Sequence, residues 1–136
     1  MLGLLAQPSS VYNQCAGCHQ SGGTGLAGAF PPLAGHVSEI LSAKGGRDYI
    51  IQLLLYGLQG EITVGGAKYN GVMPAFAQLK DEQIAAVLNH IATQWGNDKM
   101  LPADHKAFTA DDVKAFRDKK LTAAQVYDLR KTLGLK

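Results

Sequence analysis

Cysteine is scarce in this chain of 136 residues: Cys15 and Cys18 are its only cysteines, and both lie in one short stretch, CAGCH. A structural zinc site needs four ligands, and a second cysteine pair is missing. The histidines outside this stretch also lack the short spacing of a zinc finger. A thioredoxin-type dithiol lies between a strand and a helix, and no apolar strand run precedes Cys15. These absences weigh against both a zinc site and a dithiol redox site.

Long apolar runs are also missing. A membrane-spanning helix needs about 20 consecutive, mostly apolar residues, and no run in the chain approaches that length. The segment MLGLLAQPSS at the start has no basic beginning and no complete apolar core, so we expect no intact signal peptide there. The sequence therefore predicts no membrane span.

Clustered positive charge is absent as well. The formal net charge is +2, and the basic excess lies in residues 97–136, whereas residues 1–96 are close to neutral. In the basic part, lysines alternate with acidic residues and lack the interleaved aromatics of a nucleic-acid-binding surface. We therefore expect no nucleic-acid partner. The length suits a single domain with one core.

The stretch that is present, CAGCH, has an interpretation that uses each of its functional side chains. Two thiols at this spacing can each add to a vinyl group on one edge of a haem. The adjacent His19 is then carried under the iron, where its imidazole can be an axial ligand. The sequence therefore predicts one covalently attached haem c.

A methionine offers the second axial ligand that a low-spin haem requires. Met73 stands in YNGVMPAF, after an Asn-Gly turn and before Pro74, which favours a constrained loop that presents the thioether. Filling a gap in the core is the more common role of a methionine. His36 could replace Met73 only in a bis-histidine site. We interpret Met73 as the distal ligand.

With these two motifs in this order, the chain resembles the class I c-type cytochromes, and among them the proteins of thermophilic bacteria that carry electrons to a haem-copper terminal oxidase. The resemblance continues through GAFPPLAGH, LLYGLQG and DEQIAAVLNHIATQWG. It implies a mainly α, class I cytochrome c fold around one covalent haem, with a small β-hairpin and a helical C-terminal extension. Residues 1–96 would form the haem domain, and residues 97–136 would be an extension packed on it.

The resemblance also implies the role of individual residues. Cys15 and Cys18 would be the thioether attachment points, with His19 as proximal ligand and Met73 as distal ligand. The carbonyl of Pro31 would accept the Nδ1 proton of His19, which fixes the orientation of that ring. The side chain of Leu33 would pack on the haem face.

Arg47 and Tyr49 are candidates for binding a haem propionate, because a buried propionate needs charge-assisted donors. An exposed arginine at the start of a helix is the alternative interpretation of Arg47. Both residues open an apolar helical stretch that ends at Gly57 or Gly60.

Four further elements are expected along the chain. Alternating apolar residues on either side of Gly65-Gly66 predict a hairpin. An apolar stripe from residue 84 to residue 95 predicts a helix that begins at Asp81 and stops at Gly96. Two more amphipathic helices are predicted, each after a capping box, and Trp95 is expected to pack on the N-terminal helix. These last two helices span residues 111–119 and 123–133.

The functional hypothesis is a monomeric one-electron carrier of a respiratory chain, not an enzyme, in the periplasm. Its acceptor would be a terminal cytochrome c oxidase, and its donor a quinol-oxidising complex or another cytochrome. A haem domain of a larger dehydrogenase or oxidase is an alternative. A peroxidase-like or gas-binding haem protein is another, if Met73 is not a ligand. The extension could brace the haem domain or dock a partner, and its apolar residues at helical spacing favour the brace.

Overall fold

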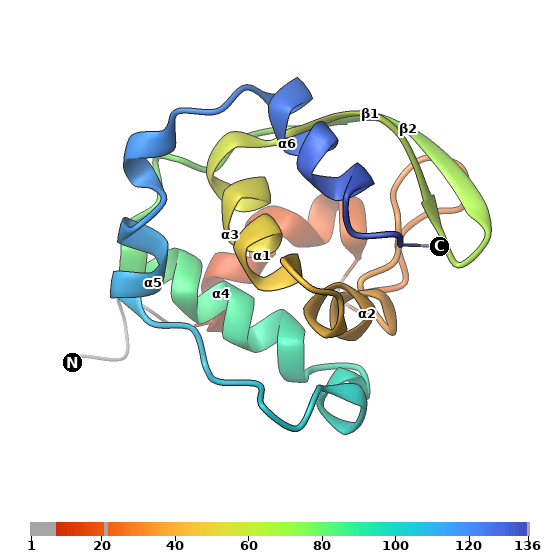
Figure 1. Cartoon of the computed structure of the whole chain (residues 1–136). Coiled ribbons are helices and arrows are strands. Elements are labelled where there is room, and N and C mark those ends of the chain that lie inside the picture. Colours follow the sequence, from red (N-terminus) through yellow and green to blue (C-terminus); the bar gives the residue numbers. More distant parts are fainter. Residues whose placement is uncertain (1–7, 21, 136) are drawn as a thin grey trace.

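The computed structural model describes residues 8–20 and 22–135, which form a set of packed helices with one antiparallel hairpin along an edge (Figure 1). The elements in chain order are α1 (Pro8–His19), α2 (His36–Ser42), α3 (Gly46–Tyr56), β1 (Leu58–Val64), β2 (Ala67–Met73), α4 (Asp81–Thr93), the 3-10 turn η2 (Asn97–Met100), α5 (Ala110–Lys114), the 3-10 turn η3 (Arg117–Lys119) and α6 (Ala123–Lys131). In this described part, no helix is both long and apolar enough to cross a membrane. The mainly α architecture with a small hairpin is confirmed.

Helix α4 is the centre of the core. Its apolar stripe is buried, with Ile84 and Leu88 fully inaccessible to solvent, and α1, α3 and α5 all contact it. The predicted packing of Trp95 on the N-terminal helix is confirmed, because its ring lies 5.4 Å from that of Tyr12 on α1. The helix itself ends at Thr93, earlier than predicted, because Trp95 adopts a left-handed backbone with φ 56°.

The hairpin has the predicted turn. Strand β1 pairs antiparallel with β2 from Leu58 opposite Met73 to Val64 opposite Ala67. Gly65 and Gly66 form the turn with φ angles of 58° and 84°, which glycine adopts without strain. The register also corrects the expectation for Met73: it pairs with Leu58 at the end of a strand and does not lie on the predicted constrained loop.

Helices α5 and α2 also differ from the expectations, and α6 ends at Lys131 rather than at residue 133. Helix α5 ends at Lys114, and the 3-10 turn η3 replaces its predicted second half. The hydroxyl of Tyr56 is within hydrogen-bond distance of the carbonyls of Phe116 and Arg117, and these bonds favour a turn there over a continued helix. Helix α2 was not predicted, because seven residues are too few for a recognisable apolar period.

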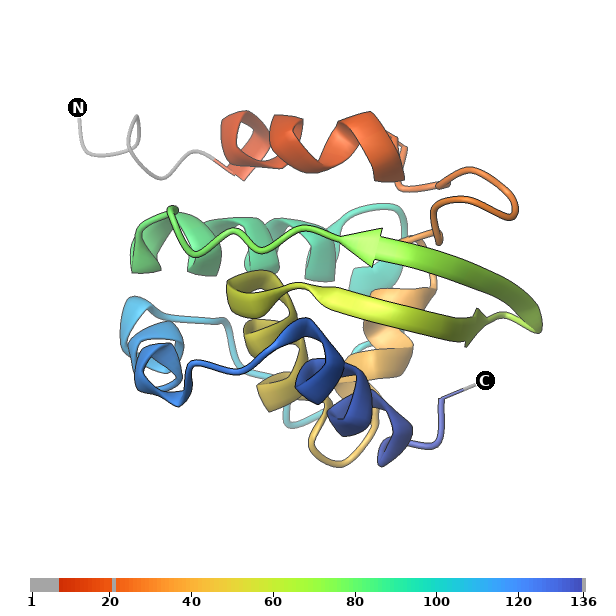
Figure 2. The ribbon, with the colours of Figure 1, turned by 90° about the horizontal axis from the view of Figure 1, so that it is seen from above.

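Residues of the extension pack against the rest of the chain. Helix α6 contacts α3 and β1, and α5 contacts α4; Figure 2 shows α6 lying beside the hairpin. Val113 and Val126 are fully buried. Both predicted capping boxes are present, with Thr109 accepting from the backbone of Asp112 and Thr122 from that of Gln125. Phe116, Leu121, Leu129 and Leu133 are partly buried and pack against the same core, a pattern compatible with the brace interpretation.

Candidate haem site

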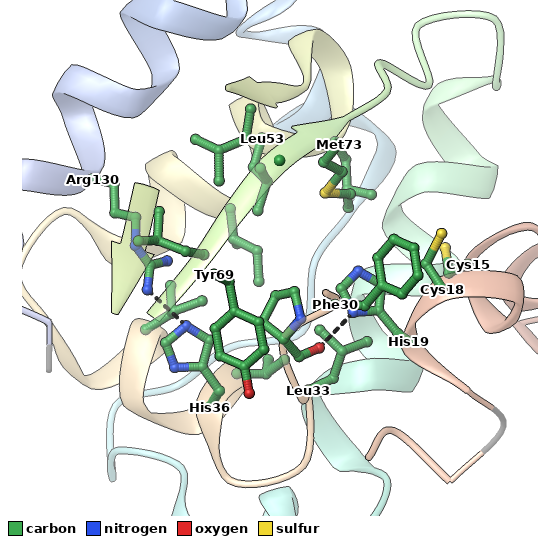
Figure 3. A pocket seen from close by; sticks show the side chains of 18 of the residues that line it. Cys15, Cys18, His19, Phe30, Leu33, His36, Leu53, Tyr69, Met73 and Arg130 are labelled. Atoms are coloured by element: carbon green, nitrogen blue, oxygen red, sulfur yellow. Dashed lines mark hydrogen bonds between the residues drawn. The ribbon is translucent and has the colours of Figure 1, made fainter. Parts of the chain in front are cut away.

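One largely apolar cavity lies between α1, the segment before α2, α3 and the hairpin (Figure 3). It brings together side chains that are far apart in sequence. Every sequence-predicted site residue except Arg47 lines it: Cys15, Cys18, His19, Pro31, Leu33, Tyr49 and Met73. Thiol, imidazole and thioether groups therefore share one apolar space.

The two thiols and the imidazole come from the last turns of α1. Cys18 and His19 lie three and four residues after Cys15, so an α-helix places both beside Cys15 on one face. Burial, and to a smaller extent the neighbouring Cys18, raises the pKa of the Cys15 thiol to about 11. A reactive dithiol needs a lowered thiol pKa. The structure therefore disfavours the thioredoxin-type interpretation, and this helical face suits two attachment points with a ligand beside them.

His19 is buried and has a fixed orientation. Its Nδ1 donates to the carbonyl oxygen of Pro31 at 2.8 Å, as the resemblance implied. Burial lowers the pKa of His19, an effect that the bond to Pro31 partly offsets. Its neutral form is therefore favoured, and Nε2 is left free of this bond. A neutral, oriented imidazole is the form that binds a metal.

Met73 reaches the cavity from the end of β2. Its side chain is half-buried and lines the same space as His19 (Figure 3). The preceding hairpin fixes its backbone on one side, and Gly57 fits closely under its carbonyl: a Cβ at Gly57 would lie 2.6 Å from that oxygen. Met73 is thus held by local backbone geometry.

A polar residue at another part of the cavity, Arg130, was not predicted from the sequence. Arg130, on α6, is 7% exposed. It donates to the Tyr49 hydroxyl at 3.2 Å, to Nε2 of His36 at 3.1 Å and to the carbonyl of Thr63 at 3.2 Å. His36 in turn donates from Nδ1 to Glu39 at 2.8 Å. Burial, followed by Arg130, lowers the pKa of His36 to about 4, so this ring is neutral at neutral pH.

The sequence contains a feature that could have pointed to Arg130 as a functional residue. It lies four residues after Val126, on the apolar face of the predicted helix, where a charged residue is unexpected. Its direct hydrogen-bond partners are neutral groups. Its positive charge is therefore available for an anionic group in the cavity.

The structure corrects the expectation that Arg47 binds a haem propionate. Its guanidinium donates to the carbonyls of Lys106 and Ala107, at 2.6 and 3.1 Å, and to Asp112 at 3.0 Å. It also stacks on Phe108, 4.1 Å from the ring centroid. Arg47 does not line the cavity. Its helix turns it toward the extension, so it cannot serve as the expected propionate donor.

The donor set fits a haem and does not fit a zinc ion. Among residues 8–20 and 22–135, no three histidine, cysteine or acidic side chains gather as a zinc site would need. The cavity instead offers paired thiols, a neutral imidazole, a thioether and, elsewhere on its wall, a buried arginine. Those are the kinds of group that would bind the vinyl groups, the iron and the carboxylates of one haem.

Comparison with known proteins agrees with this chemistry. The Cytochrome c family model matches residues 9–95. Cytochrome c-552 of Thermus thermophilus is 64% identical over 131 residues, which cover 96% of this chain and 99% of that protein. A second cytochrome c-552, from a named strain of the same species, is also 64% identical over 131 residues, which cover 96% of this chain and 88% of that protein.

A more distant relative is part of a larger protein. The cytochrome c subunit of a quinone alcohol dehydrogenase from Gluconacetobacter polyoxogenes is 34% identical over 111 residues. The match covers 80% of this chain and 22% of that subunit. The family model and the Thermus proteins, by contrast, account for most of this chain. The chain therefore belongs to the cytochrome c family, whose members bind covalent haem c.

Proposed function

We propose that the protein is a one-electron carrier whose haem c is attached through Cys15 and Cys18 and ligated by His19 and Met73. The observation that supports this is the meeting of all four side chains in one apolar cavity. When bound, the haem supplies the ferric/ferrous couple. In a carrier of this kind, protein ligands would fill both axial positions of the iron, so that no substrate could bind to it. We accordingly propose no enzymatic activity.

The residues around the ligands favour the reduced state. The Pro31 carbonyl holds the His19 ring in one tautomer and orientation. Methionine opposite histidine raises the reduction potential. The apolar cavity wall adds to this effect, because a medium of low polarity destabilises the additional positive charge of the ferric state.

Arg130 and Tyr49 are proposed to bind the haem propionates, and His36, whose only N–H already donates to Glu39, is proposed to orient the guanidinium. Arg130 and Tyr49 are buried, line the cavity and offer N–H and O–H donors. The guanidinium is already oriented by its bonds to both neighbours. A preorganised cation of this kind compensates a carboxylate at a lower cost in side-chain entropy than a surface arginine would.

The partners and compartment are proposed from the family. A high-potential carrier would receive electrons from a quinol-oxidising complex or another cytochrome and deliver them to a terminal cytochrome c oxidase in the periplasm. The similarity to the Thermus proteins along almost the full chain supports a separate carrier. The division into a haem domain at 1–96 and an extension at 97–136 is proposed as well, and the family match ending at residue 95 supports it.

The test is the absorption spectrum of the purified ferric protein. We expect the weak near-infrared band of an iron to methionine-sulfur bond, and we expect Met73→Ala to abolish it. Met100→Ala is the control, because Met100 is 51% exposed and outside the cavity. An absent band in the unmodified protein, or its survival in Met73→Ala, would show that Met73 is not the ligand.

The similarity to a dehydrogenase subunit suggests a second candidate function, a haem subunit of a larger enzyme. A haem subunit of a larger dehydrogenase would show the same spectrum but would co-purify with its partner from the native source. A carrier would be isolated alone. Rapid carbon monoxide binding to the reduced protein would instead indicate an open-site haem protein.

A further inference from the structure

Another arginine of the extension, Arg117 of η3, contacts the segment that follows Met73. Its Nε donates to Oδ1 of Asp81 at 2.7 Å, and its Nη1 to the carbonyl of Ala77 at 2.7 Å. Its Nη2 donates to the carbonyl of Leu79 at 2.5 Å. One guanidinium thus joins two backbone carbonyls and a carboxylate at the start of α4.

The segment needs such support, because residues 74–80 form neither helix nor strand and are mostly exposed. A backbone bond from the amide of Phe76 to the carbonyl of Leu54 holds its first half to α3 at 2.8 Å. In its second half, Arg117 contacts both Ala77 and Leu79. The segment is therefore fixed at its two halves by different parts of the chain.

Arg117 is itself held in place. The Tyr56 hydroxyl, on α3, contacts the carbonyls of Phe116 and Arg117, and it accepts from the amide of Lys120 at 3.1 Å. The side chain of Arg117 is 27% exposed, and that of Asp81 25% exposed. The guanidinium is therefore preorganised on the haem-bearing part of the chain, and its ion pair is partly shielded from solvent.

We propose that Arg117 is a positioning residue that keeps Met73 on the iron. This inference rests on the proposed ligation by Met73. A thioether is a neutral and weak donor to ferric iron, so the backbone on both sides must hold it there. The hairpin fixes the chain before Met73, and Arg117 fixes the chain after it. Release of Met73 with its following segment requires the bonds of Arg117 to break.

The experiment is an alkaline titration of the full-length ferric holoprotein, followed by the near-infrared band. For Arg117→Ala we expect the pH at which half of the band is lost to fall by about one unit. Partly exposed hydrogen bonds from a charged group are strong enough for about a tenfold change in the release equilibrium. Arg117→Lys should give a smaller shift, because lysine keeps the charge but cannot bridge three acceptors.

The chain offers a matched control in Arg47. Arg47 also joins two carbonyls and one carboxylate across the boundary with the extension, at 33% exposure, but it contacts residues 106–112 and not the Met73 segment. Arg47→Ala should reduce global stability to a similar degree without moving the midpoint of the band. Circular dichroism in the far ultraviolet, recorded at each pH, identifies unfolding in either variant.

A second readout follows the segment directly. The Leu79 amide lies in the half of the segment that Arg117 contacts and donates to the Phe76 carbonyl at 3.0 Å. Its hydrogen exchange in the ferric holoprotein should become about tenfold faster in Arg117→Ala and stay unchanged in Arg47→Ala. Equal shifts of the band midpoint in both variants, or none in Arg117→Ala, would overturn the inference while leaving ligation by Met73 intact. A missing band in the unmodified protein would overturn ligation and this inference together.

Discussion

Arg47 and Arg130 show that the environment of a side chain, and not its type, decides its function. Both are arginines on amphipathic helices, yet Arg47 bonds to the carbonyls of the extension and Arg130 lies buried on the cavity wall. Arg130 is also the only lysine, arginine or acidic residue of the described chain that lines the cavity. Its charge therefore acts on the site at an effective dielectric well below that of water.

This charge gives a prediction for the reduction potential. Arg130→Gln should lower it, because a nearby positive charge disfavours the ferric state more than the ferrous state. For one charge on the order of 10 Å away at an effective dielectric near 30, the effect is about 1 kcal/mol, or about 40 mV. Voltammetry of the variant measures it. Arg47→Gln, outside the cavity, should shift the potential by much less, and equal shifts would argue against the assigned role of Arg130.

At the scale of the elements, the start of the hairpin depends on a glycine. Gly57 has φ 81° and ψ −174°, a conformation that other residues essentially do not adopt. It ends α3 and starts the turn into β1, directly beneath the backbone of Met73. The break between helix and strand, and the placement of the proposed ligand, therefore depend on the same glycine.

Gly57→Ala should accordingly destabilise both the fold and the ligation. The added Cβ would lie 2.6 Å from the Met73 carbonyl. Strain and overlap together should cost about 2–4 kcal/mol in the free energy of unfolding. Denaturant unfolding of the holoprotein, with the near-infrared band recorded beforehand, measures both effects. Gly96→Ala is the control: Gly96 has φ 83° but no atom near the new Cβ, and about 1 kcal/mol is expected. Similar costs at both positions would contradict the overlap argument.

For the molecule as a whole, apolar side chains surround the opening of the cavity. Ala29, Val72 and Pro74 line the cavity and are also exposed, and Val72 is 68% exposed. The basic excess lies instead in residues 97–136. A redox partner that approaches the opening would therefore meet an apolar surface with little charge.

Electron transfer to the proposed acceptor, a terminal oxidase, should consequently depend weakly on salt. Between about 10 and 200 mM ionic strength, we expect the second-order rate constant to change less than about threefold, because steering by opposite charges is a minor contribution. Stopped-flow oxidation of the reduced protein measures this dependence. A decrease of tenfold or more would point to docking through lysines, and substitution of lysines in residues 97–136 would then locate them.

The sequence was sufficient for features that depend on neighbouring residues. The spacing in CAGCH sets two thiols and an imidazole on one helical face, because the helix repeat is local. Gly65-Gly66 fixed the hairpin turn for the same reason. The capping boxes at Thr109 and Thr122 were also readable, since each involves residues three apart.

Contacts between distant residues required the fold. That Arg130 and not Arg47 reaches the cavity follows from how α6 packs on α3 and β1, and no short spacing encodes that packing. The bonds of Arg117 to the segment after Met73 depend likewise on the 3-10 turn that Tyr56 holds. The haem anchor thus follows from residues that are close in the sequence. The places that Arg117 and Arg130 take up follow only from the packing of the extension, because contacts between distant residues depend on the whole core.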